Sequence, residues 1–386
     1  MNKTRIRPYH IAVNWCVRAV IVFLFVLSLT ETTLCILPAA NNLYWPAVAV
    51  SMELWPWFIV INVLGLLLLR LKSKVIAAIF TLGLVISVWP LFYVSSVTAS
   101  VEAQWKKQYT HVSDAPGTAR LFLKSFTDHT VPGIVPRQLQ DGILFYSAPN
   151  IPVSKLKPTI IDIHGGGWHY GSPNDDEIFS CFLADKGYAV FSIPYRLAPD
   201  FTFPTQLDDV RKAIAWIHAN AIKFGADSAR IVLMGRSAGG NLALLAGYTS
   251  DDVPISGIIS FYPATDLKEM YYDAPEPDPH NVPLTIAEFL GGTPDQIPEK
   301  YALASPITFV TAGLPPTLQL QGSRDKIQKP LFPRALHTGL IQNGNLSILV
   351  ELPWSHHSFD FVYFCPGGHL ARHYIEQFLA ETVGPK

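Results

Sequence analysis

Apolar residues dominate the first part of the 386-residue chain, whereas the remainder alternates short apolar runs with polar turns. Three long apolar stretches lie at about Ile11–Thr30, Trp55–Leu69 and Val75–Val94. Each is close to the length of about 20 residues with which an α-helix crosses a bilayer, and none has the polar face of a helix that covers a soluble core. The pattern predicts a transmembrane region of about three helices over residues 1–97.

Two other interpretations of these stretches remain open. The first stretch could be a cleaved signal peptide, although cleavage would leave the two later stretches able to span a membrane. All three could instead be core helices of a large soluble domain. Arg18 interrupts the first stretch, but an arginine near a helix end can extend its side chain to the membrane interface.

Basic residues predict how this region is oriented. They cluster at the start of the first stretch and between the second and third, while residues 19–69 contain none. Because cytoplasmic loops are enriched in Lys and Arg, we expect both clusters in the cytoplasm and everything after about Val97 on the other side. The sequence therefore predicts an integral membrane protein whose larger part is extracytoplasmic, either periplasmic or extracellular. The clusters are Lys3, Arg5, Arg7 and Arg18, and then Arg70, Lys72 and Lys74.

From residue 157 onward, apolar runs of strand length alternate with stretches of helical periodicity. This βαβ alternation predicts an α/β domain over residues 157–386 with a mostly parallel, doubly wound sheet. Residues 98–156 are expected to be a connecting segment with leading strands and cap material, and a proline- and acid-rich insertion at about 265–301 is expected to be a small cap. The predicted strands are Pro158–Ile163, Ala189–Ile193, Arg230–Met234, Ile255–Phe261, Thr317–Gln321 and Leu346–Leu352, and the predicted helices are Asp176–Lys186, Leu207–Phe224, Ala238–Tyr248 and Gly368–Val383.

Composition mainly excludes classes of function. The net charge is −1 and the chain has no basic run or zinc-like Cys/His spacing, so neither a nucleic-acid partner nor a metal is expected. Charged residues make up 15% of the chain, against about 25% in soluble domains, which agrees with a membrane-embedded part. The four cysteines are expected to be packing thiols rather than a disulfide framework.

Two glycine-rich strings carry the candidate chemistry. Gly235-Arg236-Ser237-Ala238-Gly239 lies between a predicted strand and a predicted helix, the context in which Gly-x-Ser-x-Gly forms a sharp turn that exposes the serine oxygen. His164-Gly165-Gly166-Gly167-Trp168 follows another strand and offers backbone N–H donors to a tetrahedral oxyanion. The two strings predict a serine hydrolase with Ser237 as nucleophile. Its oxyanion hole would be formed by the backbone N–H groups of Gly165, Gly166 and Ala238.

A serine nucleophile needs a histidine to take its proton and a carboxylate to orient that histidine. Asp325 and then His357 follow late predicted strands, in the chain order that this arrangement requires. Asp360 and Glu351 compete with Asp325, but surface or loop-bracing roles suit them better. His356 is adjacent to His357, and spacing alone leaves the two histidines almost equal.

Other conspicuous residues are assigned to structure. Arg196, at the end of a predicted strand, is expected to pair with Asp208 or Asp209. Three tyrosines could line a pocket, but aromatic residues in an insertion more often form its own small core, so they are not among the candidate site residues. These are Tyr262, Tyr271 and Tyr272.

The motifs resemble the hormone-sensitive-lipase-like branch of the α/β-hydrolases, which includes bacterial esterases and the related feruloyl-esterase-like domains. The resemblance extends from about Lys157 to Leu379. In this family the base commonly precedes a small residue and a phenylalanine, so His357-Ser358-Phe359 favours His357 over His356. Besides these residues and the two glycine-rich strings, the resemblance to the family rests on Tyr195-Arg-Leu-Ala-Pro199, Phe203-Pro-Thr-Gln-Leu-Asp-Asp-Val210, Leu290-Gly-Gly-Thr-Pro294, Ser305-Pro306, Pro315-Pro316 and Gly322-Ser-Arg-Asp325.

This resemblance implies an α/β-hydrolase fold and hydrolysis of a small or lipid-borne carboxylic ester through an acyl-serine intermediate, without a metal or organic cofactor. Arg236 departs from the family, because many members carry an acidic residue before the nucleophile, and substrate preference therefore stays open. The acyl chain length, the alcohol and the oligomeric state also stay open. An amidase or acyltransferase would use the same residues, and a non-catalytic receptor or adhesion module could share the fold.

Overall fold

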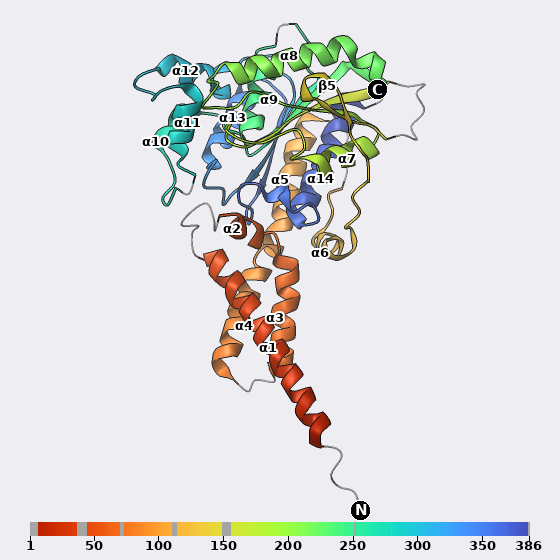
Figure 1. Ribbon diagram of the computed structural model, residues 1–386, viewed down its shortest axis with the longest axis vertical. Coiled ribbons are helices and arrows are strands. Elements are labelled where there is room, and N and C mark those ends of the chain that lie inside the picture. Colours follow the sequence, from red (N-terminus) through yellow and green to blue (C-terminus); the bar gives the residue numbers. More distant parts are fainter. Residues whose placement is uncertain are drawn as a thin grey trace, which may run out of the picture.

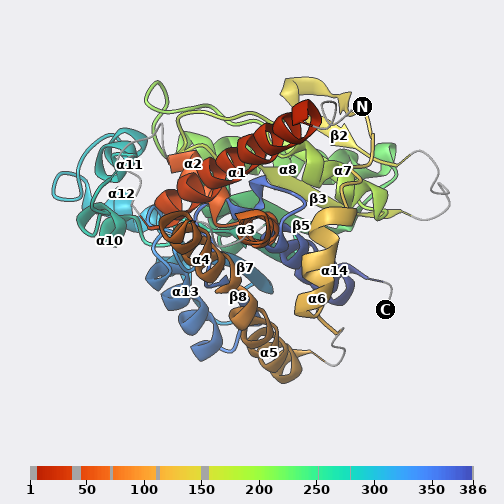
Figure 2. The same ribbon diagram turned by 90° about the horizontal axis from the view of Figure 1, so that it is seen from below.

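The protein consists of a helical stalk and an α/β domain above it (Figure 1). The computed structural model describes residues 7–36, 45–69, 73–109, 114–148, 156–250, 252–278 and 280–384. The stalk contains the long helices α1 (Arg7–Ile36), α3 (Trp55–Leu69) and α4 (Lys74–Val88), and the short α2 (Trp45–Ser51) lies where the stalk meets the domain. Seen from the stalk side, these helices lie beneath the middle of the domain (Figure 2).

Two of the described helices are long and apolar enough to cross a membrane. They are Cys16–Ile36 and the continuous segment Lys74–Gln108, whereas Trp55–Leu68 is apolar but shorter. In both long segments only 22% of the most apolar window is buried, so most of the apolar surface is uncovered. Two of the three predicted stretches thus have the length and composition that a membrane span needs, and the three-helix transmembrane region stays a prediction.

The start of α1 lies at the far end of the stalk, together with the end of α3 and the start of α4 (Figure 1). The described start of α1, end of α3 and start of α4 therefore lie on the same side of the stalk, away from the α/β domain. Within the predicted clusters, Lys3, Arg5, Arg70 and Lys72 lie outside the described residues.

Buried polar side chains hold the three stalk helices together. Ser28 Oγ on α1 donates to Asn62 Oδ1 on α3 at 2.6 Å, and Ser87 Oγ on α4 donates to Glu31 Oε1 on α1 at 2.9 Å. All four side chains are buried. Because buried polar groups need hydrogen-bond partners, these bonds between helices favour the observed helix arrangement.

The α/β domain is built on one eight-stranded sheet in the order β1-β2-β4-β3-β5-β6-β7-β8. Pairing is antiparallel between β1 and β2 and between β2 and β4, and parallel from β4 to β8. This confirms the predicted mostly parallel sheet. The strands are β1 (Arg137–Gln138), β2 (Leu144–Tyr146), β3 (Lys157–Ile163), β4 (Ala189–Ile193), β5 (Ala226–Arg236), β6 (Gly257–Phe261), β7 (Thr317–Gly322) and β8 (Ser347–Leu352).

Helices cover both faces of the sheet and bury one apolar cluster on each. One face carries α8 (Thr205–Asn220), α9 (Ala238–Tyr248) and α13 (Leu331–Gln342). The other carries α5 (Leu91–Gln108), α6 (Thr118–Thr127), α7 (Glu177–Asp185) and α14 (Pro366–Val383). The insertion forms α10 (Leu267–Tyr272), α11 (Val282–Leu290) and α12 (Pro298–Leu303), which lie together at one side of the domain (Figure 1).

Most predicted strands and helices occur within a few residues of their expected bounds, and β4 and α9 have the predicted bounds. The segment 98–156 differs, because α5 and α6 lie where leading strands were expected and only the short β1 and β2 follow them. The strand β5 is also longer than its apolar run, since residues from Ala226 onward pair with the start of β3 across a register shift at Pro158/Thr159. All four cysteines are free thiols.

Two glutamines on α5 form hydrogen bonds with the backbone groups of β8 at the edge of the sheet. Gln104 accepts from the Leu349 N–H at 2.9 Å and donates to the Leu349 carbonyl at 3.1 Å. Gln108 makes the same pair of bonds with Ser347, at 2.7 and 2.8 Å. The spacing fits because four residues of helix rise about 6 Å and two residues of strand about 6.6 Å. The side-chain amides thus replace a ninth strand.

We predict that Gln104→Ala and Gln108→Ala each lower the stability of the full chain by about 1–3 kcal/mol, because each removes two hydrogen bonds worth about 0.5–1.5 kcal/mol apiece. Thermal unfolding in detergent would measure the change, with Lys107→Ala, on an exposed position of the same helix, as control. Equal midpoints for the glutamine variants and the control would contradict the edge-pairing role.

Candidate active site

Ser237 lies in a strained turn between the last residue of β5 and the first of α9. Its backbone has φ 53° and ψ −115°, an unusual conformation for a residue other than glycine. The turn is crowded: a Cβ added to Gly239 would lie 2.0 Å from the Ile163 carbonyl oxygen, and one added to Gly235 would lie 2.3 Å from the Gly239 carbonyl oxygen. Only glycine fits at these two positions, so the motif spacing is a steric requirement.

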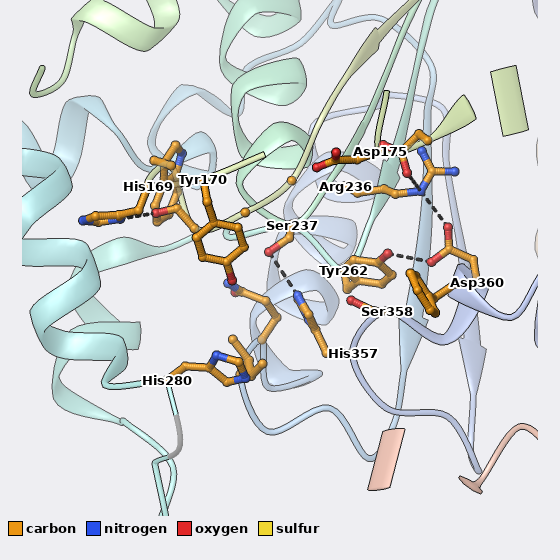
Figure 3. A pocket seen from close by; sticks show the side chains of 18 of the residues that line it. His169, Tyr170, Asp175, Arg236, Ser237, Tyr262, His280, His357, Ser358 and Asp360 are labelled. Atoms are coloured by element: carbon orange, nitrogen blue, oxygen red, sulfur yellow. Dashed lines mark hydrogen bonds and ion pairs between the residues drawn. The ribbon is translucent and has the colours of Figure 1, made fainter. Parts of the chain in front are cut away.

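The structure brings Ser237, His357 and Asp325 together in one hydrogen-bonded series. Figure 3 shows the contact between Ser237 and His357. His357 Nε2 lies 3.0 Å from Ser237 Oγ, and His357 Nδ1 lies 2.7 Å from Asp325 Oδ2. Since the Nδ1–H donates to the carboxylate, the Nε2 lone pair faces the serine hydroxyl. This arrangement can remove a proton from Ser237 as the oxygen attacks an electrophile.

Four donors determine the orientation of the buried Asp325 carboxylate. Its Oδ1 accepts from the backbone N–H groups of Ile327 and Gln328, each at 2.9 Å. Its Oδ2 accepts from Gln321 Nε2 at 3.2 Å as well as from His357. Both oxygens are therefore held in the direction that the histidine requires.

The competing residues have other partners. Burial lowers the pKa of His356 to about 4, so this imidazole is neutral at neutral pH, and it is His357 that reaches Ser237. Glu351 accepts from Arg334 and from Ser323, the loop-bracing role expected for it. Asp360 also braces a loop, but it is buried rather than at the surface.

The glycine loop lies directly against the serine turn. A Cβ added to Gly165 would lie 3.0 Å from the Arg236 carbonyl oxygen and 3.7 Å from Ser237 Cβ. This contact places the start of the glycine loop beside the nucleophile, and the oxyanion hole itself stays a prediction. The side chain of His164 stacks on Tyr195 at 4.2 Å and its ring donates to the Gly165 carbonyl at 2.8 Å. Burial lowers the pKa of His164 and so favours the neutral form of its ring.

The insertion holds the glycine loop from the outside. Trp168 stacks on Phe289 of α11 with ring centres 4.1 Å apart and planes at 4°. His169 contacts Glu288 Oε2 at 3.0 Å through Nε2 and the Gly167 carbonyl at 2.7 Å through Nδ1. Sequence reasoning missed this contribution of α11, because nothing in the spacing indicates which insertion residues return to the loop.

A mainly apolar cavity of about 830 Å³ opens around Ser237. Tyr262 lies on its wall: its ring is 4.3 Å from the ring of His357, and its hydroxyl donates to Asp360 Oδ1 at 2.6 Å. Tyr262 was left out of the sequence-based site, and its position directly after β6 is the signal that could have found it. Tyr271 packs on Tyr301 within the insertion, as expected for that residue. Apolar lining residues include Trp168, Ile178, Phe179, Met270, Val282 and Ile286.

Arg236, the residue before the nucleophile, is the centre of a buried charge cluster. Its Nε lies 2.6 Å from Asp360 Oδ2 and 3.1 Å from Asp176 Oδ1, and its Nη1 lies 3.5 Å from Asp162 Oδ1. The guanidinium also lies over the rings of Phe179 and Phe261, at 4.7 and 4.4 Å. Burial and the neighbouring carboxylates raise the pKa of Asp162 to about 8.

The cluster explains why Arg236 stands where many family members carry an acidic residue. Its guanidinium contacts three buried aspartates, and an acidic side chain there would add a fourth acid to the cluster. Arg196, by contrast, makes the expected pair with Asp209 near the surface, with its Nε 2.7 Å from the carboxylate.

The sheet order, the strained serine turn and the serine–histidine–aspartate series define an α/β-hydrolase fold. Comparison with known proteins agrees: the BD-FAE family model matches residues 147–340, about half of the chain, and the chain belongs to this family of hormone-sensitive-lipase-like α/β-hydrolases.

Two relatives are from Mycobacterium tuberculosis strain H37Rv. A probable carboxylic ester hydrolase, LipM, is 29% identical over 61% of this chain and 56% of its own length. The esterase LipC is 33% identical over 54% and 55%. The chain thus spans about half the length of these curated relatives. Among solved structures, a bacterial heroin esterase superposes with a TM-score of 0.57 at 29% identity, covering 67% of this chain and 87% of the other.

We predict that Arg236→Met destabilises the protein by about 3–5 kcal/mol, the usual cost of leaving buried carboxylates without their counter-charge. The midpoint of thermal or denaturant unfolding would measure the loss. Arg196→Met, which removes the arginine–aspartate pair with Asp209 near the surface, is the matched control and should change the midpoint far less. A loss no larger than that of the control would show that the cluster does not need its cation.

Proposed function

We propose that this protein is a membrane-anchored carboxylesterase that hydrolyses small-molecule or lipid-borne carboxylic esters through an acyl-serine intermediate. Ser237 is the nucleophile, His357 the general base and Asp325 the residue that orients it. The observation that carries the proposal is the unbroken series from Ser237 Oγ through His357 to Asp325, at 3.0 and 2.7 Å, on the wall of an apolar cavity.

In the first half of the reaction, Ser237 Oγ attacks the ester carbonyl carbon while His357 Nε2 takes the serine proton. The carbonyl oxygen becomes an oxyanion that accepts hydrogen bonds from the backbone N–H groups of Gly165, Gly166 and Ala238. The last of these is at the N-terminus of α9, where the helix dipole favours negative charge. His357 then gives its proton to the leaving alcohol oxygen, and the carbon–oxygen bond breaks.

In the second half, a water molecule loses a proton to His357 Nε2 and attacks the acyl-serine carbonyl. The same N–H groups stabilise the second oxyanion, His357 returns the proton to Ser237 Oγ, and the carboxylic acid leaves. Throughout, Asp325 stabilises the imidazolium and holds the ring in the tautomer that presents Nε2 to the serine.

Support for ester hydrolysis comes from the relatives, whose names describe ester hydrolases. Support for an anchor comes from the exposed apolar surface of the two long helices. In this proposal the catalytic domain is extracytoplasmic. The start of α1 and the α3–α4 end of the stalk, both near basic clusters, lie together on the side opposite the domain (Figure 1).

We predict that Ser237→Ala and His357→Ala each lower kcat for ester hydrolysis by at least about 10⁴-fold, because each removes a member of a unit that acts together. The measurement is hydrolysis of p-nitrophenyl esters from acetate to palmitate by the full chain in detergent. His218→Ala, a histidine on α8, is the control and should retain full activity.

Matched p-nitroanilides and an alcohol acceptor in the same assay separate the alternatives. Cleavage of anilides alone would indicate an amidase, and formation of a new ester would indicate an acyltransferase. A folded protein that cleaves no ester or anilide and whose Ser237 does not react with a fluorophosphonate would point to a non-catalytic module.

The proposed topology predicts opposite labelling of two engineered cysteines in intact cells. Val135→Cys, on an exposed part of the domain, should react with a membrane-impermeant maleimide without permeabilisation. Lys74→Cys, at the start of α4, should react only after permeabilisation. A Cys16→Ser background removes the one exposed native thiol. Labelling of both cysteines in intact cells would overturn the topology.

A further inference from the structure

The junction between α2 and α3 reaches into the α/β domain through Glu53. This side chain is completely buried, with 0% exposure. Its Oε1 accepts a short hydrogen bond from Ser355 Oγ, and its Oε2 accepts from the Gly367 N–H at 3.3 Å. Both partners belong to the part of the domain that follows β8 and contains His357. A residue of the stalk region is therefore hydrogen-bonded to the loop of the catalytic base.

Ser355 also joins the loop of His357 to the loop of Asp325. Its backbone carbonyl accepts from the Arg324 N–H at 2.9 Å. The two loops are in close backbone contact here, because a Cβ on Gly322 would lie 2.4 Å from the Ser355 carbonyl oxygen. Ser355 is two residues from His357, and Arg324 is adjacent to Asp325. Ser355, whose side chain donates to Glu53, is thus the residue at which the two loops are in contact.

A second contact links the stalk to the loop of Asp325. Arg324 Nη2 donates to the carbonyl of Cys35, near the end of α1, at 3.2 Å. Its Nη1 lies 3.8 Å from Met52 Sδ, next to Glu53 in the chain. Each of the two loops that supply the histidine and the aspartate therefore has its own contact with the stalk region.

A buried carboxyl at position 53 does more than join the stalk to the domain, because it also orients its hydrogen-bond partners. Burying a carboxyl is costly, and here burial raises its pKa to about 7. An apolar side chain would fill the same space without that cost. A carboxyl instead fixes the direction of its two partners, and the close fit is visible at Gly367, where an added Cβ would lie 2.7 Å from Glu53 Oε2.

We propose that Glu53 is a positioning residue for the Ser237–His357–Asp325 series: through Ser355 it sets the distance between the two loops, so that His357 stays within reach of both the serine and the aspartate. The inference rests on the proposed function. It means that the junction between α2 and α3 contributes to catalysis by positioning the catalytic residues.

The test compares Glu53→Ala, Ser355→Ala, the double variant and Glu53→Gln, all as the full chain in detergent, with Glu102→Ala as control. Glu102 lies on α5, outside the catalytic loops, and forms an ion pair with Lys106. The concentration of active sites is titrated with a fluorophosphonate, so that kcat is expressed per reactive Ser237. KM, the rate of fluorophosphonate labelling and the thermal midpoint are measured in parallel.

We expect Glu53→Ala to lower kcat per active site and the labelling rate by about 10–100-fold with KM changed less than about threefold, since a displacement near 1 Å of catalytic groups costs about 100-fold. The double variant should be no worse than the more severe single variant, because both single changes break the same connection. Glu53→Gln should restore most of the activity, because its amide can donate to Ser355 Oγ and accept from the Gly367 N–H.

If Glu53→Ala lowers only the thermal midpoint or the number of titratable sites, with kcat per site equal to the control, Glu53 is merely structural and the inference is wrong. Independent, multiplicative losses in the double variant would also contradict it. Failure of the proposed function looks different: the wild-type chain itself would then neither hydrolyse esters nor label at Ser237, and the positioning role would fall with it.

Discussion

The site depends on one close approach of two backbones, where Gly239 at the start of α9 lies against the carbonyl oxygens of Ile163 and His164 at the end of β3. Because no side chain fits between them, the serine turn is pressed onto the neighbouring strand and the glycine loop that follows β3 lies beside Ser237. The strained backbone of Ser237 is maintained by this packing and by the bond from its N–H to the Phe261 carbonyl at 2.9 Å.

The sheet could be predicted from the sequence because its parallel strands are buried on both faces and read as continuous apolar runs. The bounds of β4 and α9 follow from such runs and from the glycines around Ser237. The edge of the domain could not be predicted in the same way. The helix α5 lies where strands were expected, and the glutamines near its end have their partners on β8, far away in the chain.

Part of the candidate site could be predicted from the sequence, because its residues lie in short motifs that follow one another in a fixed chain order. Ser237, Asp325 and His357 are of this kind. Contacts between segments that are distant in the sequence could not be predicted. The pairing of His169 with Glu288 and the cluster around Arg236 depend on tertiary contacts that no local pattern encodes. The same holds for Glu53, whose hydrogen-bond partner Ser355 lies 302 residues later in the chain.

The glutamine pair on α5 has a consequence for a protein that we propose to be held in a bilayer. Confinement to a surface raises the frequency with which identical copies meet side by side, and an uncovered edge strand would then offer a ready template for sheet-to-sheet addition. With the amides of Gln104 and Gln108 occupying the outward N–H and carbonyl groups of Ser347 and Leu349, that route to lateral aggregation is closed by the same helix that enters the domain from the stalk. Anchoring and protection from self-association thus share a single helix, and lengthening or rotating that helix would expose the sheet to its neighbours.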